Sequence, residues 1–305
     1  MSSSLGAFVV LSFAASICVG FAAAMTGGSQ SPMVVALGLT AMLSPALAAW
    51  LAARIGRDPV GTIGVKSFPF AYLPVALLAV PVVQHAMGIP VMFLSFGYLP
   101  WVPWLSPDST GLFHPPPEMH LGEAITAAGL ARGLALKAVL GLFIVSLFAL
   151  GEEVGWRGYM QSRIVRRYGI AKGIALSAAI WAVWHLPYSI SGLHHIAEVP
   201  LCALLVIMPV GHFGLGLFLG WLYQRTSSIW LAAIAHGAAN NWGQFAFRFM
   251  EGDAANLPLA IGNSIALLTL GLVVVLLRKT RRNSKDRLES PPTMQQKDQV
   301  CGRST

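Results

Sequence analysis

The sequence predicts an all-α membrane protein, a polytopic transmembrane helical bundle of about eight spans. Apolar residues make up 55% of the 305 residues and charged residues only 10%. A soluble domain carries about 25% charged residues. Basic residues also gather in short segments between long apolar ones. These observations are typical of a chain that crosses a bilayer several times.

Eight apolar windows approach the roughly 20 residues needed to span a bilayer. The first has no basic segment before it and no small-residue cleavage site after it, so we expect an anchor and not a cleaved signal. A Pro-rich outer loop follows the third window, and a polar, basic tail follows the last. The windows cover residues 5–25, 31–53, 69–91, 132–154, 172–190, 199–222, 228–249 and 258–278.

The distribution of the net charge of +8 is typical of a membrane protein and not of a nucleic-acid-binding surface. Sixteen of the twenty Lys and Arg follow the second, fourth, sixth and eighth windows. The loops on the other side, 26–30, 92–131, 191–198 and 250–257, contain none. Because cytoplasmic loops collect positive charge, this alternation predicts that both termini are cytoplasmic.

Charges that end the fourth apolar window need an explanation. Glu152, Glu153 and Arg157 follow a long apolar run, and charges at membrane depth mark functional sites by default. Residues i and i+4 share a helix face, so Glu153 and Arg157 should form an ion pair. Glu152 points about 100° away and needs another partner. An interfacial charge cluster at a helix end is the alternative.

Two further polar clusters lie in later windows. Trp181 and His185 are four residues apart in the fifth window, and His236 and Asn240 are four apart in the seventh. Each pair should therefore share one helix face. A packed histidine and an interhelical hydrogen bond are the corresponding structural alternatives.

Together the clusters supply groups for hydrolysis. A Glu and a His can activate a water molecule by removing its proton. Two His and a carboxylate are also a catalytic zinc set with one open position. An Asn and a His could donate to a developing oxyanion.

These residues resemble the three motifs of the CPBP intramembrane proteases, which include type II CAAX prenyl endopeptidases and bacterial Abi-type proteins. Glu152, Glu153 and Arg157 match Glu-Glu-x-x-x-Arg. Trp181 and His185 match an aromatic residue followed four positions later by His. His236 and Asn240 match His-x-x-x-Asn. The family usually has Phe in the second motif, and we expect its replacement by Trp to change shape and not chemistry.

The resemblance implies an intramembrane endopeptidase. Glu152 and His185 would activate water, His236 and Asn240 would stabilise the oxyanion, and Glu153, Arg157 and Trp181 would support them. Two alternatives stay open: a zinc ion held by Glu152, His185 and His236, or a glutamate-activated water without metal. The substrate would be a peptide or protein, with a prenylated Cys-a-a-X protein as one alternative.

The resemblance and the composition together divide the chain into four parts. Residues 1–125 would form N-terminal helices and the outer loop, 126–250 the CPBP-like core, 251–280 the last helix and 281–305 a disordered cytoplasmic tail. We expect an integral multi-pass protein in contact with lipid, located in the plasma membrane if the source is a bacterium, and with no nucleic-acid partner.

The remaining histidines have weaker assignments. His212 could reach the same interior as an accessory group, His85 should form an interhelical hydrogen bond, and His194 and His195 should be exposed. The rival class is a scaffold without catalysis or a proton-coupled transporter, because buried Glu and His also build proton relays.

Overall fold

The computed structural model describes residues 3–26, 32–57, 65, 67–99, 101–190, 201, 203–243, 245–250 and 256–289. Regular structure in these ranges is helical, apart from two isolated β-bridges, which confirms the predicted all-α class. The longer helices are α1 (Ser3–Ala24), α2 (Pro32–Ile55), α3 (Leu73–Phe96), α4 (Ala127–Glu153), α6 (Ile170–Trp184), α8 (Met208–Thr226), α9 (Ile229–Asn241) and α10 (Asn256–Glu289). Shorter pieces are η1 (Phe70–Tyr72), η2 (Pro103–Leu105), η3 (Pro117–Met119), η4 (Val154–Gln161), α5 (Ser162–Tyr168), α7 (Leu186–Tyr188), η6 (Ala203–Ile207) and η7 (Ala246–Phe249).

The helices correspond to the eight predicted windows, but they differ in length. Within the described ranges, six helical segments are long and apolar enough to cross a membrane. The other two windows hold α6, with 15 residues, and α9, with 13. At 1.5 Å per residue these two helices are only about 20 Å long, shorter than the ~30 Å hydrocarbon core.

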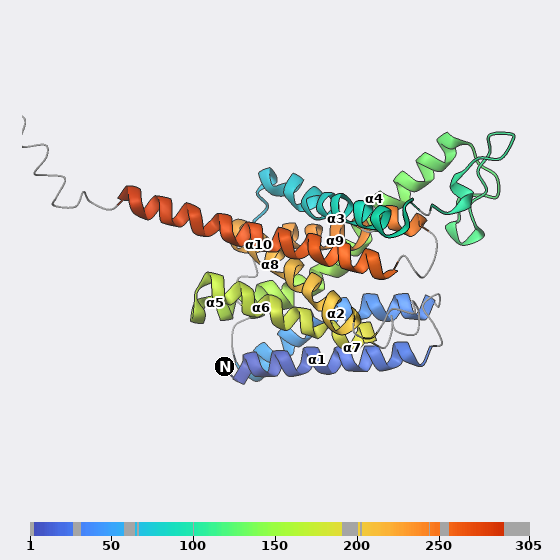
Figure 1. The fold of residues 1–305 in the computed structure, drawn as a ribbon. Coiled ribbons are helices and arrows are strands. Elements are labelled where there is room, and N and C mark those ends of the chain that lie inside the picture. Colours follow the sequence, from blue (N-terminus) through green and yellow to red (C-terminus); the bar gives the residue numbers. More distant parts are fainter. Residues whose placement is uncertain are drawn as a thin grey trace, which may run out of the picture.

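Helix α8 lies inside the bundle, where it packs against α6, α9 and α10 (Figure 1). Half of its most apolar window is buried, whereas only 6% of the corresponding window of α4 is buried. α4 contacts α2 and α9 and leaves an apolar face outward, as a helix against lipid would. The start of α1, α5 and the far end of α10 lie at one end of the bundle, opposite the loop that joins α3 to α4.

The fourth predicted window ends at residue 154, one residue after the end of α4 at Glu153, but helical structure does not stop there. Helical structure continues from Ala127 to Tyr168, because α4 passes through the π-helix η4 into α5. The chain then reverses at Gly169, whose φ of 77° lies in the left-handed region that glycine adopts without strain. α6 returns along α5, so α4, η4, α5 and α6 form one long hairpin.

Glycines allow this hairpin to lie close to α2. A Cβ at Gly151 would lie 2.8 Å from the carbonyl oxygen of Met42, and one at Gly155 would lie 2.5 Å from that of Pro45. Gly216 of α8 packs against Ala178 of α6 in the same way. The small residues of α4, η4 and α8 thus allow close helix packing.

The outer loop has a defined conformation, with Phe113 and Ile125 paired in an antiparallel bridge. At the other end of the chain, α10 extends to Glu289, into the region whose composition predicts a disordered tail. Residues 290–305 lie outside the described residues.

Candidate active site

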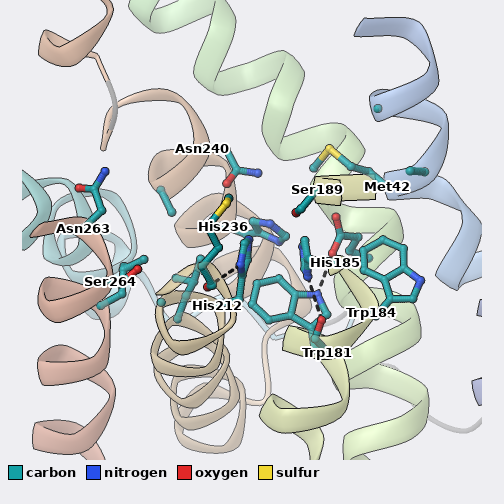
Figure 2. Close-up of a pocket in the computed structure, with 18 of the residues that line it drawn as sticks. Met42, Trp181, Trp184, His185, Ser189, His212, His236, Asn240, Asn263 and Ser264 are labelled. Carbon is teal, nitrogen blue, oxygen red and sulfur yellow. Dashed lines mark hydrogen bonds between the residues drawn. The ribbon is translucent and has the colours of Figure 1, made fainter. Parts of the chain in front are cut away.

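One cavity of about 360 Å³ between the helices brings together most of the residues that the sequence singled out (Figure 2). Glu152 comes from the end of α4, Trp181 and His185 from α6 and its end, and His236 and Asn240 from α9. α8 adds His212, and α1, α2, α3 and α10 complete the wall. Other lining residues include Ser16, Met42, Gln84, Ser189, Asn263 and Ser264.

The reversal at Gly169 explains how Glu152 and His185 reach the same depth. Glu152 lies 17 positions before Gly169 and His185 lies 16 positions after it. Each is therefore about 25 Å from the reversal along its own arm. The helical continuation from α4 through η4 and α5 to Tyr168 gives the first arm this length.

Glu152 is buried, and its partner is Trp181. The indole Nε1 of Trp181 donates a hydrogen bond of 2.8 Å to Oε2 of Glu152. The sequence predicted that Glu152 needed a partner other than Arg157. However, the expectation that Trp changes only shape was wrong, because a Phe side chain has no N–H group to donate.

Glu153 forms the predicted ion pair and one further bond that the sequence did not reveal. Arg157 Nη1 donates to Oε1 of Glu153 at 3.0 Å, which confirms the expected i,i+4 pair. His236 Nδ1 donates to the same oxygen at 2.9 Å. The first and third motifs are thus joined through Glu153, in the pattern by which a carboxylate orients a histidine.

The three cavity histidines are all held by Nδ1. Carbonyl oxygens only accept hydrogen bonds, so Nδ1 of His185 donates to Trp181 and Nδ1 of His212 donates to Met208, at 2.8 and 2.9 Å. His236 uses Nδ1 toward Glu153. Nε2 of each ring remains outside these bonds and is the atom left for substrate, water or a metal.

This donor chemistry fits zinc. Imidazole nitrogens and a carboxylate are zinc ligands, and ligating histidines typically donate their other N–H to a carbonyl or a carboxylate, as here. In the part of the chain that the structure describes, no three His, Cys, Asp or Glu side chains are already gathered as a set that could hold an ion. Both the zinc and the metal-free alternatives therefore stay predictions.

Other histidines lie outside this set. His85 on α3 does not line the cavity, and its Nδ1 bonds to Pro81 of its own helix at 2.8 Å, so the expected interhelical bond is wrong. His194 and His195 lie outside the described residues. Ser16 and Met42 line the cavity from helices without a motif, and no pattern in the sequence marks them.

The fold and the cavity define a polytopic α-helical membrane protein with an internal polar site that holds Glu, His and Asn side chains. Residues 134–242 match the profile of the family described as type II CAAX prenyl endopeptidase Rce1-like. A CAAX prenyl protease 2 of Methanococcus maripaludis is 31% identical over 107 residues, which are 32% of this chain and 38% of the relative. Both matches confirm the resemblance to the CPBP family that the motifs indicated.

The comparisons concern the hairpin and the helices that follow it. The matched segment contains the three motifs, most of α4 and every helix from η4 to α9. The alignment covers 38% of the length of the curated relative. Residues 134–242 are therefore the part of the chain that is similar to the type II CAAX prenyl endopeptidases.

Proposed function

We propose that this protein is an intramembrane endopeptidase that hydrolyses a peptide bond in the internal cavity. The observation that carries this proposal is the meeting of Glu152, His185, His236 and Asn240, which lie on three separate helices, around one cavity. The similarity of the same segment to CAAX prenyl proteases supports hydrolysis over transport or a scaffold role.

Glu152 and His185 would activate the water. Trp181 holds one oxygen of Glu152, so the other oxygen can accept a proton from water. Nδ1 of His185 is bonded to the Trp181 carbonyl. Nε2 is therefore the His185 nitrogen that would accept or carry a proton near Glu152. The water oxygen would attack the carbonyl carbon, and the abstracted proton would pass to the amine as the C–N bond breaks.

His236 and Asn240 would stabilise the tetrahedral intermediate. The Asn240 amide can donate to the oxyanion. His236 can donate through Nε2 when its ring is protonated, and Glu153 would then face the resulting positive charge. Arg157 would keep Glu153 in place from the other side.

If zinc is bound, Glu152, His185 and His236 would hold it. The ion would polarise the scissile carbonyl and lower the pKa of a bound water. The hydrogen bonds from Trp181 and to Glu153 would orient the ligands in that case as well.

The comparison supports one substrate class as the first to test. The relative is named a CAAX prenyl protease, so a peptide ending in a prenylated Cys-a-a-X sequence is the first substrate to test. An unprenylated peptide of the same sequence serves as its counterpart.

The decisive variant is E152Q, assayed in purified protein with a quenched fluorescent farnesylated Cys-a-a-X peptide. The amide oxygen of Gln can still accept from Trp181, but Gln cannot take up the proton of water. We expect kcat to fall roughly 10²- to 10⁴-fold, whereas E123Q, in the exposed outer loop, should retain full activity.

Unchanged cleavage by E152Q would overturn the proposed mechanism. Metal analysis of the same wild-type preparation, followed by the assay after chelation, separates the two alternatives. Loss of activity on chelation and its recovery on addition of zinc would favour the metal route.

A further inference from the structure

We propose that His212 is a positioning residue of this site: its ring stacks on His185 and holds that imidazole in its working orientation. The proposal rests on the proposed peptidase function and extends it to α8, a helix that carries none of the three motifs. His212 lines the cavity together with the motif residues.

His185 lies at the junction between α6 and α7. α6 ends at Trp184, and His185 is the residue that follows, just before Leu186 and Pro187. Nδ1 of His185 donates to the Trp181 carbonyl at 2.8 Å, so one atom of the ring is held by its own helix. The faces of the ring are left to neighbouring side chains.

Three rings surround His185. The ring centroids of Trp181 and Trp184 lie 4.5 and 4.9 Å away, nearly perpendicular to the imidazole. His212 lies 4.1 Å away with an interplanar angle of 22°, so it is the ring that covers a face of His185. Figure 2 shows the two histidines side by side between α6 and α8.

His212 is itself anchored. Its Nδ1 donates to the Met208 carbonyl one turn earlier at 2.9 Å, and the Trp181 ring lies 5.8 Å from it at a steep angle. α8 is the most buried of the candidate spans. The ring of His212 is thus fixed in place, and the ring of His185 stacks on it.

The chain provides a matched control in His85. Its Nδ1 also bonds to the carbonyl four residues earlier, at 2.8 Å, and its ring stacks on Phe247 with a centroid distance of 5.0 Å. His85 is half-buried like His212 but does not line the cavity. Removing either ring should therefore cost similar packing, with different consequences for catalysis.

The experiment compares H212A, H212F, H85A and H85F by unfolding temperature and by kcat and KM on the farnesylated peptide. Misplacing a catalytic group by about 1 Å can cost roughly 10²-fold in rate. For H212A we expect kcat to fall roughly 10- to 100-fold with KM changed less than about threefold. H212F keeps a flat ring, so its kcat should return to within about threefold of wild type.

H85A should match H212A in unfolding temperature and keep wild-type kcat. Histidine-labelled protein supplies an independent readout: the ¹⁵N signal of His185 should show one Nδ1–H tautomer in wild type and H212F, and a broadened signal in H212A. If H212A does not fold, the comparison of H212F with H212L takes its place.

Two results would overturn the inference. One is a kcat of H212A equal to that of H85A, and the other is a loss in H212F as large as that in H212A, because then a nitrogen and not stacking is required. E152Q is measured in parallel, so that activity surviving in E152Q counts against the peptidase mechanism and not against His212.

Discussion

Trp181 is the side chain that contacts most of the candidate site. Its indole N–H bonds to Glu152, and the guanidinium carbon of Arg157 lies 4.6 Å from the centre of its ring. The ring also presents its edge or face to His185 and His236, at 4.5 and 5.4 Å. A single buried residue thus connects the carboxylate, the cation and the imidazoles.

The substitution W181F tests this connection, since it restores the aromatic residue that the family usually has. The ring packing is kept, but Glu152 loses its donor. A hydrogen bond to a charged group contributes about 1.5–3 kcal/mol, so we expect kcat to fall about tenfold or more.

The matched control for W181F is W242F. Trp242 donates its N–H to the Ala138 carbonyl at 3.0 Å and does not line the cavity. Equal kinetic losses in the two variants, measured on the same peptide, would show that the Glu152 bond has no special role.

The packing of whole helices sets the position of the site. The polar end of α4 lies against α2 because Gly151 and Gly155 allow the backbones to approach. The π-helix η4 begins directly after the two glutamates, and π-helical segments often occur at functional sites. The close contact with α2 and the wider π-helical turn of η4 together position this part of the cavity wall.

For G155A we expect a loss of about 1–3 kcal/mol in the free energy of unfolding, because the new methyl group would meet the Pro45 backbone. At Gly6 in α1, an added methyl group would have no atom within 4 Å, so G6A should be neutral or stabilising by up to about 1 kcal/mol. Denaturant unfolding in detergent measures both. A G155A protein as stable as G6A would contradict the packing account.

The outer loop carries its own pH-sensitive pair. His114 donates Nε2–H to Asp108 at 2.8 Å and Nδ1–H to the Glu123 carbonyl at 3.1 Å, which requires the protonated ring. The bond to the Asp108 carboxylate raises the pKa of His114, and the bond from His114 lowers the pKa of Asp108.

The two pKa shifts affect the stability of the loop at opposite ends of the pH range. A raised His pKa stabilises the loop below the ordinary value of 6.5 and loses that effect as pH rises through the raised pKa. A lowered Asp pKa stabilises it above 3.8 and loses that effect as pH falls. The loop should therefore be most stable between these two values.

We expect pH-corrected hydrogen-exchange protection of the Thr110 and Leu112 amides, which donate to Asp108, to fall above neutral pH in wild type. In H114Q the protection should be lower at acidic pH and should change little across the same range. A flat wild-type profile from about pH 5 to about pH 9 would refute the pair's contribution.

In the molecule as a whole, the distribution of charge and the arrangement of the helices favour one orientation across the membrane. The start of α1, α5 and the far end of α10 share one end of the bundle, and the outer loop lies at the other (Figure 1). Basic residues gather at the first end, where positive-inside topology expects the cytoplasm. Reporter fusions in the tail and in the outer loop should accordingly report opposite sides, and agreement between them would exclude this topology.

Sequence patterns predicted the all-α bundle, the Glu153–Arg157 pair and the residues that meet in the cavity, because hydropathy and i,i+4 spacing are local properties. The continuation of α4 into α5 escaped prediction, since Arg163, Arg166 and Arg167 read as the end of a span. The Trp181–Glu152 and His236–Glu153 bonds escaped as well, because they join residues 29 and 83 positions apart. Only tertiary packing decides such pairs.

The reversal at Gly169 makes chain length inside the hairpin a determinant of the site. One residue added to α5 would shift Glu152 by about 1.5 Å and turn it by about 100° relative to His185. Homologous chains that keep the chemistry should therefore hold the number of residues between Glu152 and His185 nearly constant. The outer loop between α3 and α4 lies outside this length constraint, so insertions and deletions should accumulate there.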